Sequence, residues 1–241
     1  METNKKILKT LRELNSENKS KDFEYYVIDQ LSKNLGFEYI DDSVWNKKYK
    51  EFKKESLSGS DDFSNCYSAY KDDDIIICNP NGSQRSPDIM IIHNKHALRL
   101  ECKTSKNGCS VWNSGLPKKD HVYIFNAYEK EDISYALGQD LISEDEIENL
   151  NMMSSIVHHL SGKVKFNSKW NYYPRAMFNL NENQCSCPER NLREYNVECF
   201  VNNFKWNSSG EVKSIFIEKD INKLNTNNKD LEELLNKIKG S

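Results

Sequence analysis

Residues 87–103 of the chain read Pro-Asp-Ile-Met-Ile-Ile-His-Asn-Lys-His-Ala-Leu-Arg-Leu-Glu-Cys-Lys. Two apolar runs flank the polar stretch His-Asn-Lys-His, and this pattern predicts a hairpin of two buried strands. Asp88 lies at the start of the first strand, whereas Glu101 and Lys103 lie near the end of the second. Charged side chains beside buried strands are costly unless they have partners, which makes these three residues candidates for a functional site.

The chemistry of these three residues indicates a metal-dependent nuclease. Two carboxylates brought together by a hairpin offer the oxygen ligands that Mg²⁺ prefers. Glu101 and Lys103 are two residues apart in one strand, so both side chains are expected on the same face. A lysine beside two carboxylates can orient or activate a water for attack on a phosphate. The alternative is a hairpin whose three charged residues face solvent in an ordinary salt-bridge network.

Other segments frame this hairpin. Apolar residues at helical spacing predict helices at 4–14, 21–35, about 143–160 and about 228–239. Apolar runs predict strands at 75–78, 88–93, 97–104, 121–127, 197–204 and 212–218. Gly36 occupies a C-cap position, Ser143 and Glu146 have the spacing of a capping box, and 41–73 lacks periodicity. With no internal repeat and no linker, residues 1–241 are expected to form a single α/β domain.

Together these elements resemble the PD-(D/E)xK nuclease superfamily, whose motif stands here as Pro87-Asp88 followed by Glu101-Cys102-Lys103. The resemblance covers roughly residues 20–130. It implies an α/β, restriction-endonuclease-like core with a central mixed β-sheet flanked by helices. It also implies that Asp88 and Glu101 ligate Mg²⁺ together with the backbone carbonyl of Cys102, and that Lys103 positions or deprotonates the attacking water.

Members of this superfamily often carry a further acid on the helix before the hairpin, and Glu24 is the candidate here. Steps of three and four residues from Glu24 reach Val27 and Ile28 on the apolar stripe, so Glu24 is expected beside the core face. Asp29 lies next to the same stripe. The alternative for Glu24 is a surface carboxylate paired with Lys21.

Residues 103–125 resemble type II restriction endonucleases, in which the catalytic strand runs into a polar loop before the next strand. This resemblance implies that four loop residues lie near DNA: Ser105, Lys106, Asn113 and Ser114. Asn113 is the candidate base reader, since asparagine can make two hydrogen bonds to adenine. The alternative is a turn-rich connector whose Asn and Ser side chains cap their own backbone.

Several arginines are candidates for contact with DNA. Arg85 lies just before Pro87-Asp88 and could reach a phosphate, the alternative being a pair with one of the acids at 72–74. Three more arginines fall in a later polar region where such enzymes often place sequence readers: Arg175, Arg190 and Arg193. The sequence does not separate these three from ordinary surface arginines.

The expected function is therefore that of a type II restriction endonuclease, which hydrolyses phosphodiester bonds in double-stranded DNA at a specific sequence with Mg²⁺. Such enzymes often act as homodimers, and the region 130–241 is expected to contribute DNA recognition, dimerisation or both. The alternatives are a structure-specific repair or recombination nuclease of the same fold, and a catalytically inactive DNA-binding protein.

Composition sets weaker bounds on these expectations. The 241 residues carry a net charge of -3, and the pI of about 6.0 argues mildly against nucleic-acid binding. Local patches could offset this balance in the lysine-rich stretches 47–54, 103–106, 118–119 and 163–169. No apolar stretch is long enough to span a membrane and the N-terminus lacks the apolar core of a signal peptide, so a cytoplasmic protein is expected.

The cysteines point to reduced thiols. Their number is 7, which is odd and does not suit a disulfide framework. Cys185 and Cys187 form one close pair and Cys199 follows, but the second pair of a structural zinc site is missing. The role of these three cysteines stays open.

Overall fold

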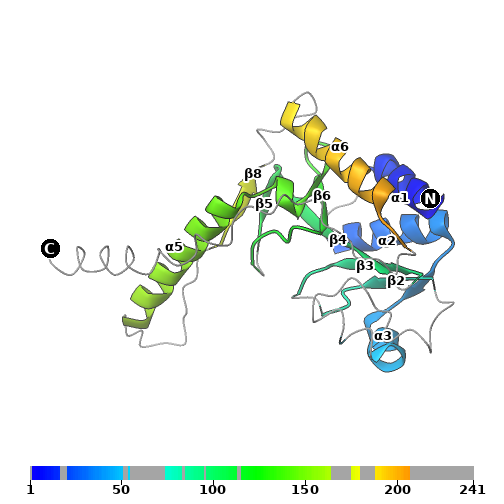
Figure 1. Cartoon of the computed structure of the whole chain (residues 1–241), viewed down its shortest axis with the longest axis horizontal. Helices are drawn as coiled ribbons and strands as arrows, with labels where there is room; N and C mark the ends of the chain where they lie inside the picture. Colours follow the sequence, from blue (N-terminus) through cyan, green and yellow to red (C-terminus); the bar gives the residue numbers. More distant parts are fainter. Residues whose placement is uncertain are drawn as a thin grey trace. The chain divides into compact units, whose positions relative to one another are not determined.

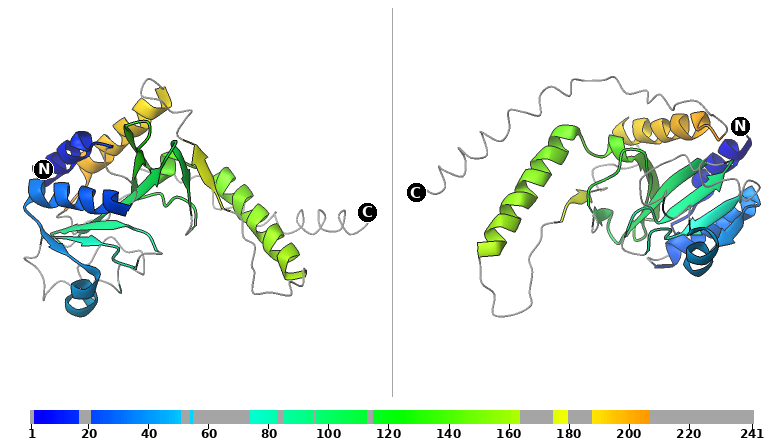
Figure 2. Two further views of the ribbon diagram at one scale, coloured as in Figure 1. Left: turned by 180° about the vertical axis from the view of Figure 1, so that it is seen from behind. Right: turned by 60° about the horizontal axis from the view of Figure 1, so that its bottom comes forward.

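The computed structural model describes residues 2–16, 21–50, 54, 74–82, 85–94, 96–112, 115–163, 175–179 and 188–206. All of these residues belong to one compact unit, Met1–Asn207 (Figure 1, Figure 2). The predicted strand at 212–218 and the predicted helix at 228–239 lie outside the described residues.

The central element is a six-stranded mixed sheet with the order β1-β2-β3-β4-β6-β7. Its strands are β1 (Glu38–Ile40), β2 (Ile75–Cys78), β3 (Ile89–His93), β4 (His96–Ser105), β6 (Val122–Ala127) and β7 (Asp132–Leu137). β2, β3 and β4 run antiparallel to one another, β1 is parallel to β2, β6 is parallel to β4, and β7 is antiparallel to β6. A separate two-stranded sheet joins β5 (Cys109–Val111) to β8 (Met177–Asn179).

Helices lie on both faces of the large sheet, which confirms the predicted α/β class with a mixed sheet flanked by helices. The helices are α1 (Glu2–Glu13), α2 (Lys21–Leu35), α3 (Asp42–Lys48), the short 3₁₀ helix η2 (Gly138–Asp140), α5 (Glu144–Lys163) and α6 (Pro188–Asn203). α1, α2 and α6 cover one face (Figure 1), and α3 covers part of the other. Within the described part of the chain, no helix is long and apolar enough to cross a membrane.

The sheet is buried on both faces because its strands carry apolar residues at consecutive positions. Every residue of β2 and β6 is buried. In β4, alternation sends Leu98, Leu100 and Cys102 into the core beneath α1, α2 and α6. Ala97 points to the opposite face, where it packs with Trp45 from α3. Odd-numbered positions of β4 therefore share the face that also carries Glu101.

Several predicted helices and strands are confirmed, together with the residues predicted to cap the helices. The hairpin forms from β3 and β4, and α2 spans the predicted 21–35. Gly36 has φ +74°, and its N–H donates to the Ser32 carbonyl at 2.8 Å, as a helix C-cap does. At the start of α5, the Ser143 N–H donates to Glu146 Oε2 at 2.8 Å and the Glu146 N–H donates to Ser143 Oγ at 3.2 Å.

Other predictions were wrong or incomplete. The strand predicted at 197–204 lies almost entirely in α6, where Val197 and Val201 are four residues apart and both buried. The short helix α3 lies in the stretch 41–73 that shows no periodicity. Its start is fixed by Asp41, whose side chain accepts a hydrogen bond from the Val44 N–H at 2.9 Å. Four short strands were not predicted: β1, β5, β7 and β8.

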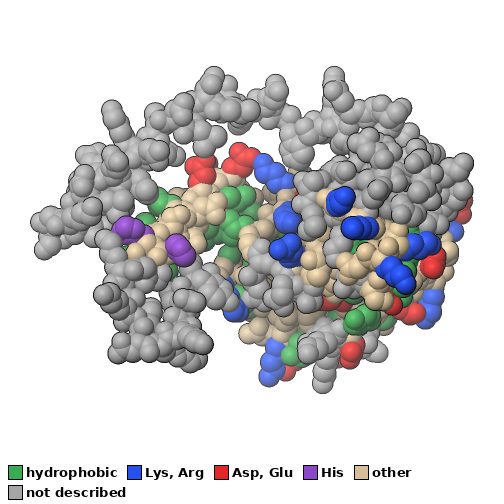
Figure 3. All heavy atoms as spheres, turned by 90° about the horizontal axis from the view of Figure 1, so that it is seen from below, with side chains coloured by type: hydrophobic (Ala, Val, Ile, Leu, Met, Phe, Trp, Pro, Cys, Tyr) green, Lys and Arg blue, Asp and Glu red, His purple; other side chains and the backbone are tan. Residues whose placement is uncertain are grey.

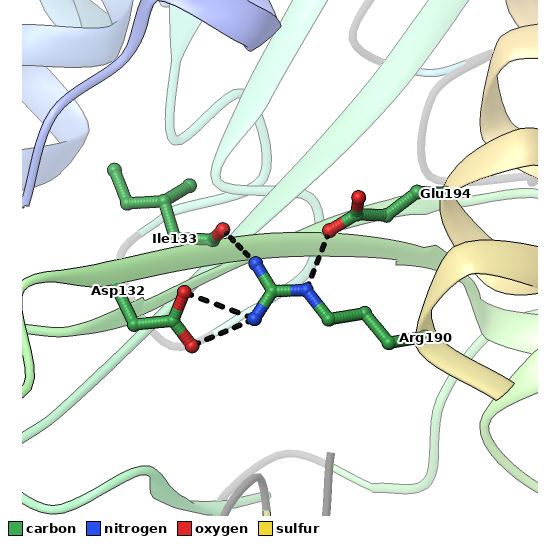
Figure 4. A network of polar contacts seen from close by, with 4 residues as sticks. All are labelled: Asp132, Ile133, Arg190 and Glu194. Atoms are coloured by element: carbon green, nitrogen blue, oxygen red, sulfur yellow. Dashed lines mark hydrogen bonds and ion pairs between the residues drawn. The ribbon is translucent and has the colours of Figure 1, made fainter. Parts of the chain in front are cut away.

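Arg190 connects α6 to β7 through hydrogen bonds and an ion pair (Figure 4). Its guanidinium donates to both carboxylate oxygens of Asp132, at 2.9 and 2.8 Å, and to Glu194 Oε1 at 2.9 Å. A further hydrogen bond goes to the carbonyl of Ile133 at 2.5 Å. With 6% of its surface exposed, Arg190 is neither a surface arginine nor accessible to DNA. It is a buried residue that joins two elements.

Gly138 allows η2 to approach the loop before β6. A Cβ atom at this position would lie 1.9 Å from the carbonyl oxygen of Lys118. We expect Gly138→Ala to lower the free energy of unfolding by about 1–3 kcal/mol, since backbone atoms must move to accept the methyl group. Urea unfolding measures this loss, with Gln139→Ala in the same turn as the control. Equal unfolding midpoints for the two variants would contradict the expectation.

Candidate functional site

The register of the sheet brings Asp88 and Glu101 opposite each other. Ile89 of β3 pairs with Leu100 of β4, so the residue before Ile89 and the residue after Leu100 occupy facing positions. Asp88 is fixed there by its Oδ2, which accepts a hydrogen bond from the Cys102 N–H at 2.8 Å. The predicted meeting of the two carboxylates therefore follows from strand pairing in the structure.

Lys103 lies beside Glu101 on the same face of β4. Its Nζ is 2.7 Å from Glu101 Oε1. Glu101 is only 4% exposed, so the alternative of a solvent-facing salt-bridge network is wrong for this residue. The second carboxylate oxygen, Glu101 Oε2, is buried and has no hydrogen-bond partner among the residues that the structure describes. A buried carboxylate oxygen without a donor is a position that a cation can fill.

Glu24 joins the same site from α2. Its side chain is half-buried. Burial raises the pKa of Glu24, the nearby Asn79 side chain opposes this rise, and the charge of Glu101 raises the pKa whereas that of Lys103 lowers it. Asp29, by contrast, is exposed, and its carboxylate pairs with the Lys33 ammonium at 2.6 Å. Glu24 therefore belongs to the site, whereas Asp29 lies on the helix surface. The alternative partner of Glu24, Lys21, has a side chain outside the described ones.

The electrostatics of the site favour a cation. Burial, followed by the neighbouring carboxylates of Glu101 and Glu24, raises the pKa of Asp88 to about 7, against the opposing effects of Lys103 and the Cys102 N–H. Three carboxylates thus share one lysine. We call Glu24, Asp88 and Glu101 the site acids.

The donor set fits Mg²⁺ through two side chains and the backbone. No three His, Cys, Asp or Glu side chains in the described part of the chain are grouped so that they alone could hold a metal ion. Asp88 and Glu101 supply carboxylate oxygens, and the carbonyl of Cys102 is the backbone donor that the motif implies. The Cys102 thiol points into the apolar core, and burial raises its pKa well above the ordinary range, so the sulfur is no ligand.

The predicted DNA-contacting residues that the structure describes lie in different surroundings. Ser105 ends β4 and its hydroxyl is buried without a partner in the described residues. Lys106 is exposed and pairs with Glu129 at 3.0 Å. Arg85 is exposed on the segment before Asp88. Asn113 and Ser114 lie outside the described residues, as do two of the alternative partners of Arg85, the acids at 72–73.

Among the described residues on the face drawn in Figure 3, lysines and arginines lie beside acidic, neutral and apolar side chains. From the lysine-rich stretches, Lys119 pairs with Glu144, as Lys106 does with Glu129. Arg193 lies over the ring of Phe178, 5.7 Å from its centroid. Among the described residues, four cysteines form no disulfide bond: Cys78, Cys102, Cys109 and Cys199. Cys185 and Cys187 lie outside that part of the chain.

Sequence reasoning missed two residues next to the site acids. Asn79 follows β2 and its N–H donates to the Asp88 carbonyl at 2.6 Å. Tyr123 of β6 pairs in register with Glu101, and its hydroxyl accepts a hydrogen bond from the Lys118 N–H at 2.9 Å. The only sequence signal for Asn79 was the turn Asn-Pro-Asn-Gly after an apolar run, and Tyr123 was hidden within an apolar run.

Chemically, the arrangement offers two facing carboxylates, a buried carboxylate oxygen with no partner among the described residues, and an ammonium group held beside them. These groups can bind a divalent cation and orient a water molecule next to it. Comparisons of the chain with protein families, with curated proteins and with solved structures find no match.

Proposed function

We propose that this chain is a Mg²⁺-dependent endodeoxyribonuclease of the PD-(D/E)xK kind, with a restriction-endonuclease-like core. It acts on double-stranded DNA at a specific sequence, as a type II restriction endonuclease does. The observation that carries the proposal is the facing pair Asp88 and Glu101, with Lys103 Nζ 2.7 Å from the Glu101 carboxylate. The order of elements supports it too, since α2 precedes the β3–β4 hairpin and β6 follows it in the same sheet.

Each residue of the site has a distinct task in this proposal. Asp88, Glu101 and the Cys102 carbonyl would hold Mg²⁺, which polarises a phosphate and lowers the pKa of bound water. Glu101 keeps the Lys103 ammonium in place through their ion pair. Lys103 can donate a hydrogen bond to the attacking water and so orient it toward phosphorus. Glu24 adds negative charge from α2.

A homodimer on duplex DNA completes the proposal. Two active centres related by a two-fold axis can cut both strands of a palindromic site. The candidate DNA contacts remain the five residues named from the sequence: Arg85, Ser105, Lys106, Asn113 and Ser114. The ion pair between Lys106 and Glu129 would have to open for Lys106 to reach a phosphate.

A plasmid digest with Mg²⁺, with EDTA and with no metal tests this function, followed by sequencing of the fragment ends. We expect discrete fragments that share one end sequence and disappear in EDTA. Asp29→Asn, which alters an exposed acid of α2, is the control variant and should give the same fragments. Smearing or cutting of branched DNA alone would favour a structure-specific nuclease. Binding without cutting would favour an inactive DNA-binding protein.

A further inference from the structure

The helix α5 carries a continuous apolar stripe that the described part of the chain leaves uncovered. It spans Glu144–Lys163 (Figure 1), and none of its side chains described between 144 and 160 is buried. Apolar residues recur along it at steps of three and four, which places them on one side of the helix. We call these residues the α5 stripe: Ile147, Leu150, Met153, Val157 and Leu160.

The exposure of the stripe indicates a binding surface. Met153 is 58% exposed and Leu160 is 53% exposed. Most helices in folded proteins are stabilised by the packing of an apolar face, because an isolated helix is marginally stable in water. The start of α5 is anchored by its capping box and by the ion pair of Glu144 with Lys119. Beyond that first turn, a partner is needed to cover the apolar side chains.

The pattern of the stripe is complementary to itself. Reversal of α5 about the point between Met153 and Ser154 exchanges position 147 with 160 and position 150 with 157. Two copies of the helix that pack antiparallel therefore bring apolar side chains together along the whole stripe. Each such contact occurs twice, as a two-fold axis requires.

The charges at the two ends of α5 favour the antiparallel direction. The first turn carries three acids and the C-terminal end carries three basic residues: Glu144, Asp145, Glu146, His158, His159 and Lys163. An antiparallel pair places the acidic end of one copy beside the basic end of the other, and it opposes the two helix dipoles. Because Glu144 pairs with Lys119 and Glu146 caps the helix, we assign this contact to Asp145.

We propose that α5 forms the interface of a homodimer, in which two copies of this helix pack antiparallel through the α5 stripe around a two-fold axis. The inference rests on the proposed function for its purpose, since a two-fold dimer suits a palindromic DNA site. The interface itself involves none of the site acids. The competing occupant of the stripe is the predicted helix at 228–239 of the same chain, which would leave the protein monomeric.

Sedimentation equilibrium of the full chain, without metal or DNA, tests the interface. We expect the wild type to have twice the mass of one chain, which is 28.2 kDa. Val157→Glu places a charge in the apolar contact of both copies and should raise the dimer Kd by about 100-fold. Ser155→Glu is the matched control, because it introduces the same residue at an exposed position on the opposite side of α5 and should leave the dimer intact.

A second variant and a stability measurement separate a lost interface from a lost fold. Leu160→Glu changes a side chain that is 53% exposed, so it should weaken the dimer as Val157→Glu does without disturbing the core of the monomer. Thermal unfolding of each variant shows whether the fold is retained.

Cysteine cross-linking tests the direction of packing. Met153→Cys lies near the two-fold axis and should form a disulfide with its own copy under mild oxidation. Leu160→Cys should not, since it would lie about 20 Å from its own copy along an antiparallel pair, given a rise of about 1.5 Å per residue. Peptide mapping distinguishes these products from links between native cysteines. Equal cross-linking of both variants would indicate a parallel pair and overturn the inference.

The remaining outcomes separate this inference from the proposed function. A wild type that cuts DNA but stays monomeric at every concentration, or a dimer that Val157→Glu and Leu160→Glu both leave unchanged, would overturn the α5 interface alone. A dimer that depends on the α5 stripe but cuts no DNA would support the interface and remove the proposed function.

Discussion

Asp88→Asn is expected to lower the rate of Mg²⁺-dependent DNA cleavage by about 10³-fold, because an amide cannot supply the negative charge that the metal site needs. DNA binding should persist, since phosphate contacts come from other residues. Single-turnover cleavage and a gel-shift assay in Ca²⁺ measure the two effects separately. Cleavage at the wild-type rate in Asp88→Asn would remove Asp88 from the site.

Although Asp88→Asn should impair cleavage, it should stabilise the folded protein in metal-free buffer above pH 7. Burial raises the pKa of Asp88 to about 7 in the folded chain, whereas an unfolded aspartate titrates near pH 4. The folded state binds this proton more tightly, so the wild type loses stability as the pH rises from about 4 through 7. The Asp88→Asn variant does not lose this stability, because its amide does not titrate. Its unfolding temperature should match the wild type near pH 4 and exceed it above pH 7.

Asp120 provides a control for which stability is expected to change with pH in the opposite direction. The hydrogen bond that the Asp120 carboxylate accepts from His121 Nδ1, together with the charges of His121 and Arg99, lowers the pKa of Asp120 to about 2. Its contribution to stability is present above the unfolded pKa and is lost as the pH falls through about 2. Asp120→Asn should therefore be less stable than the wild type at neutral pH, and the difference should vanish in acid. Parallel pH curves for Asp88→Asn and the wild type would contradict the raised pKa.

Local patterns were sufficient for the elements that position the site acids. The alternation of Leu98, Leu100 and Cys102 predicted that Glu101 and Lys103 share a face, and the structure places them 2.7 Å apart. The apolar stripe of α2 placed Glu24 beside the core, where it is half-buried. These features depend on periodicity within single strands and helices, and periodicity can be read along a chain.

Features that depend on pairing between distant segments could not be read in this way. The Asn79 N–H reaches the Asp88 carbonyl only because β2 pairs with β3, and the Glu24 carboxylate lies near Asp88 only because α2 packs against β2 and β4. Arg190 is buried because Asp132, 58 positions away in the chain, accepts its guanidinium. A strand was predicted at 197–204, in a region that mixes aromatic and polar residues, and packing against the sheet selected a helix instead.

Lys103→Met is expected to separate the two tasks of Lys103, stability and catalysis. Its side chain and that of Glu101 are 16% and 5% exposed, so the variant leaves a buried carboxylate without its cation. The metal-free protein should lose about 3–5 kcal/mol of unfolding free energy. Lys106→Met is the stability control, since Lys106 pairs with Glu129 at the surface and should cost less than about 1 kcal/mol.

Removing both charges distinguishes packing from chemistry. Lys103→Met combined with Glu101→Gln removes the carboxylate charge that Lys103 pairs with directly, and it should recover part of the lost stability. Ca²⁺ should stabilise Lys103→Met more than it stabilises the wild type, because the ion replaces the missing positive charge beside Glu101. Neither change restores a group that orients water, so single-turnover cleavage by Lys103→Met should stay about 10²- to 10⁴-fold slower even at saturating Mg²⁺. A wild-type cleavage rate in a stable Lys103→Met protein would show that Lys103 serves the fold and not the reaction.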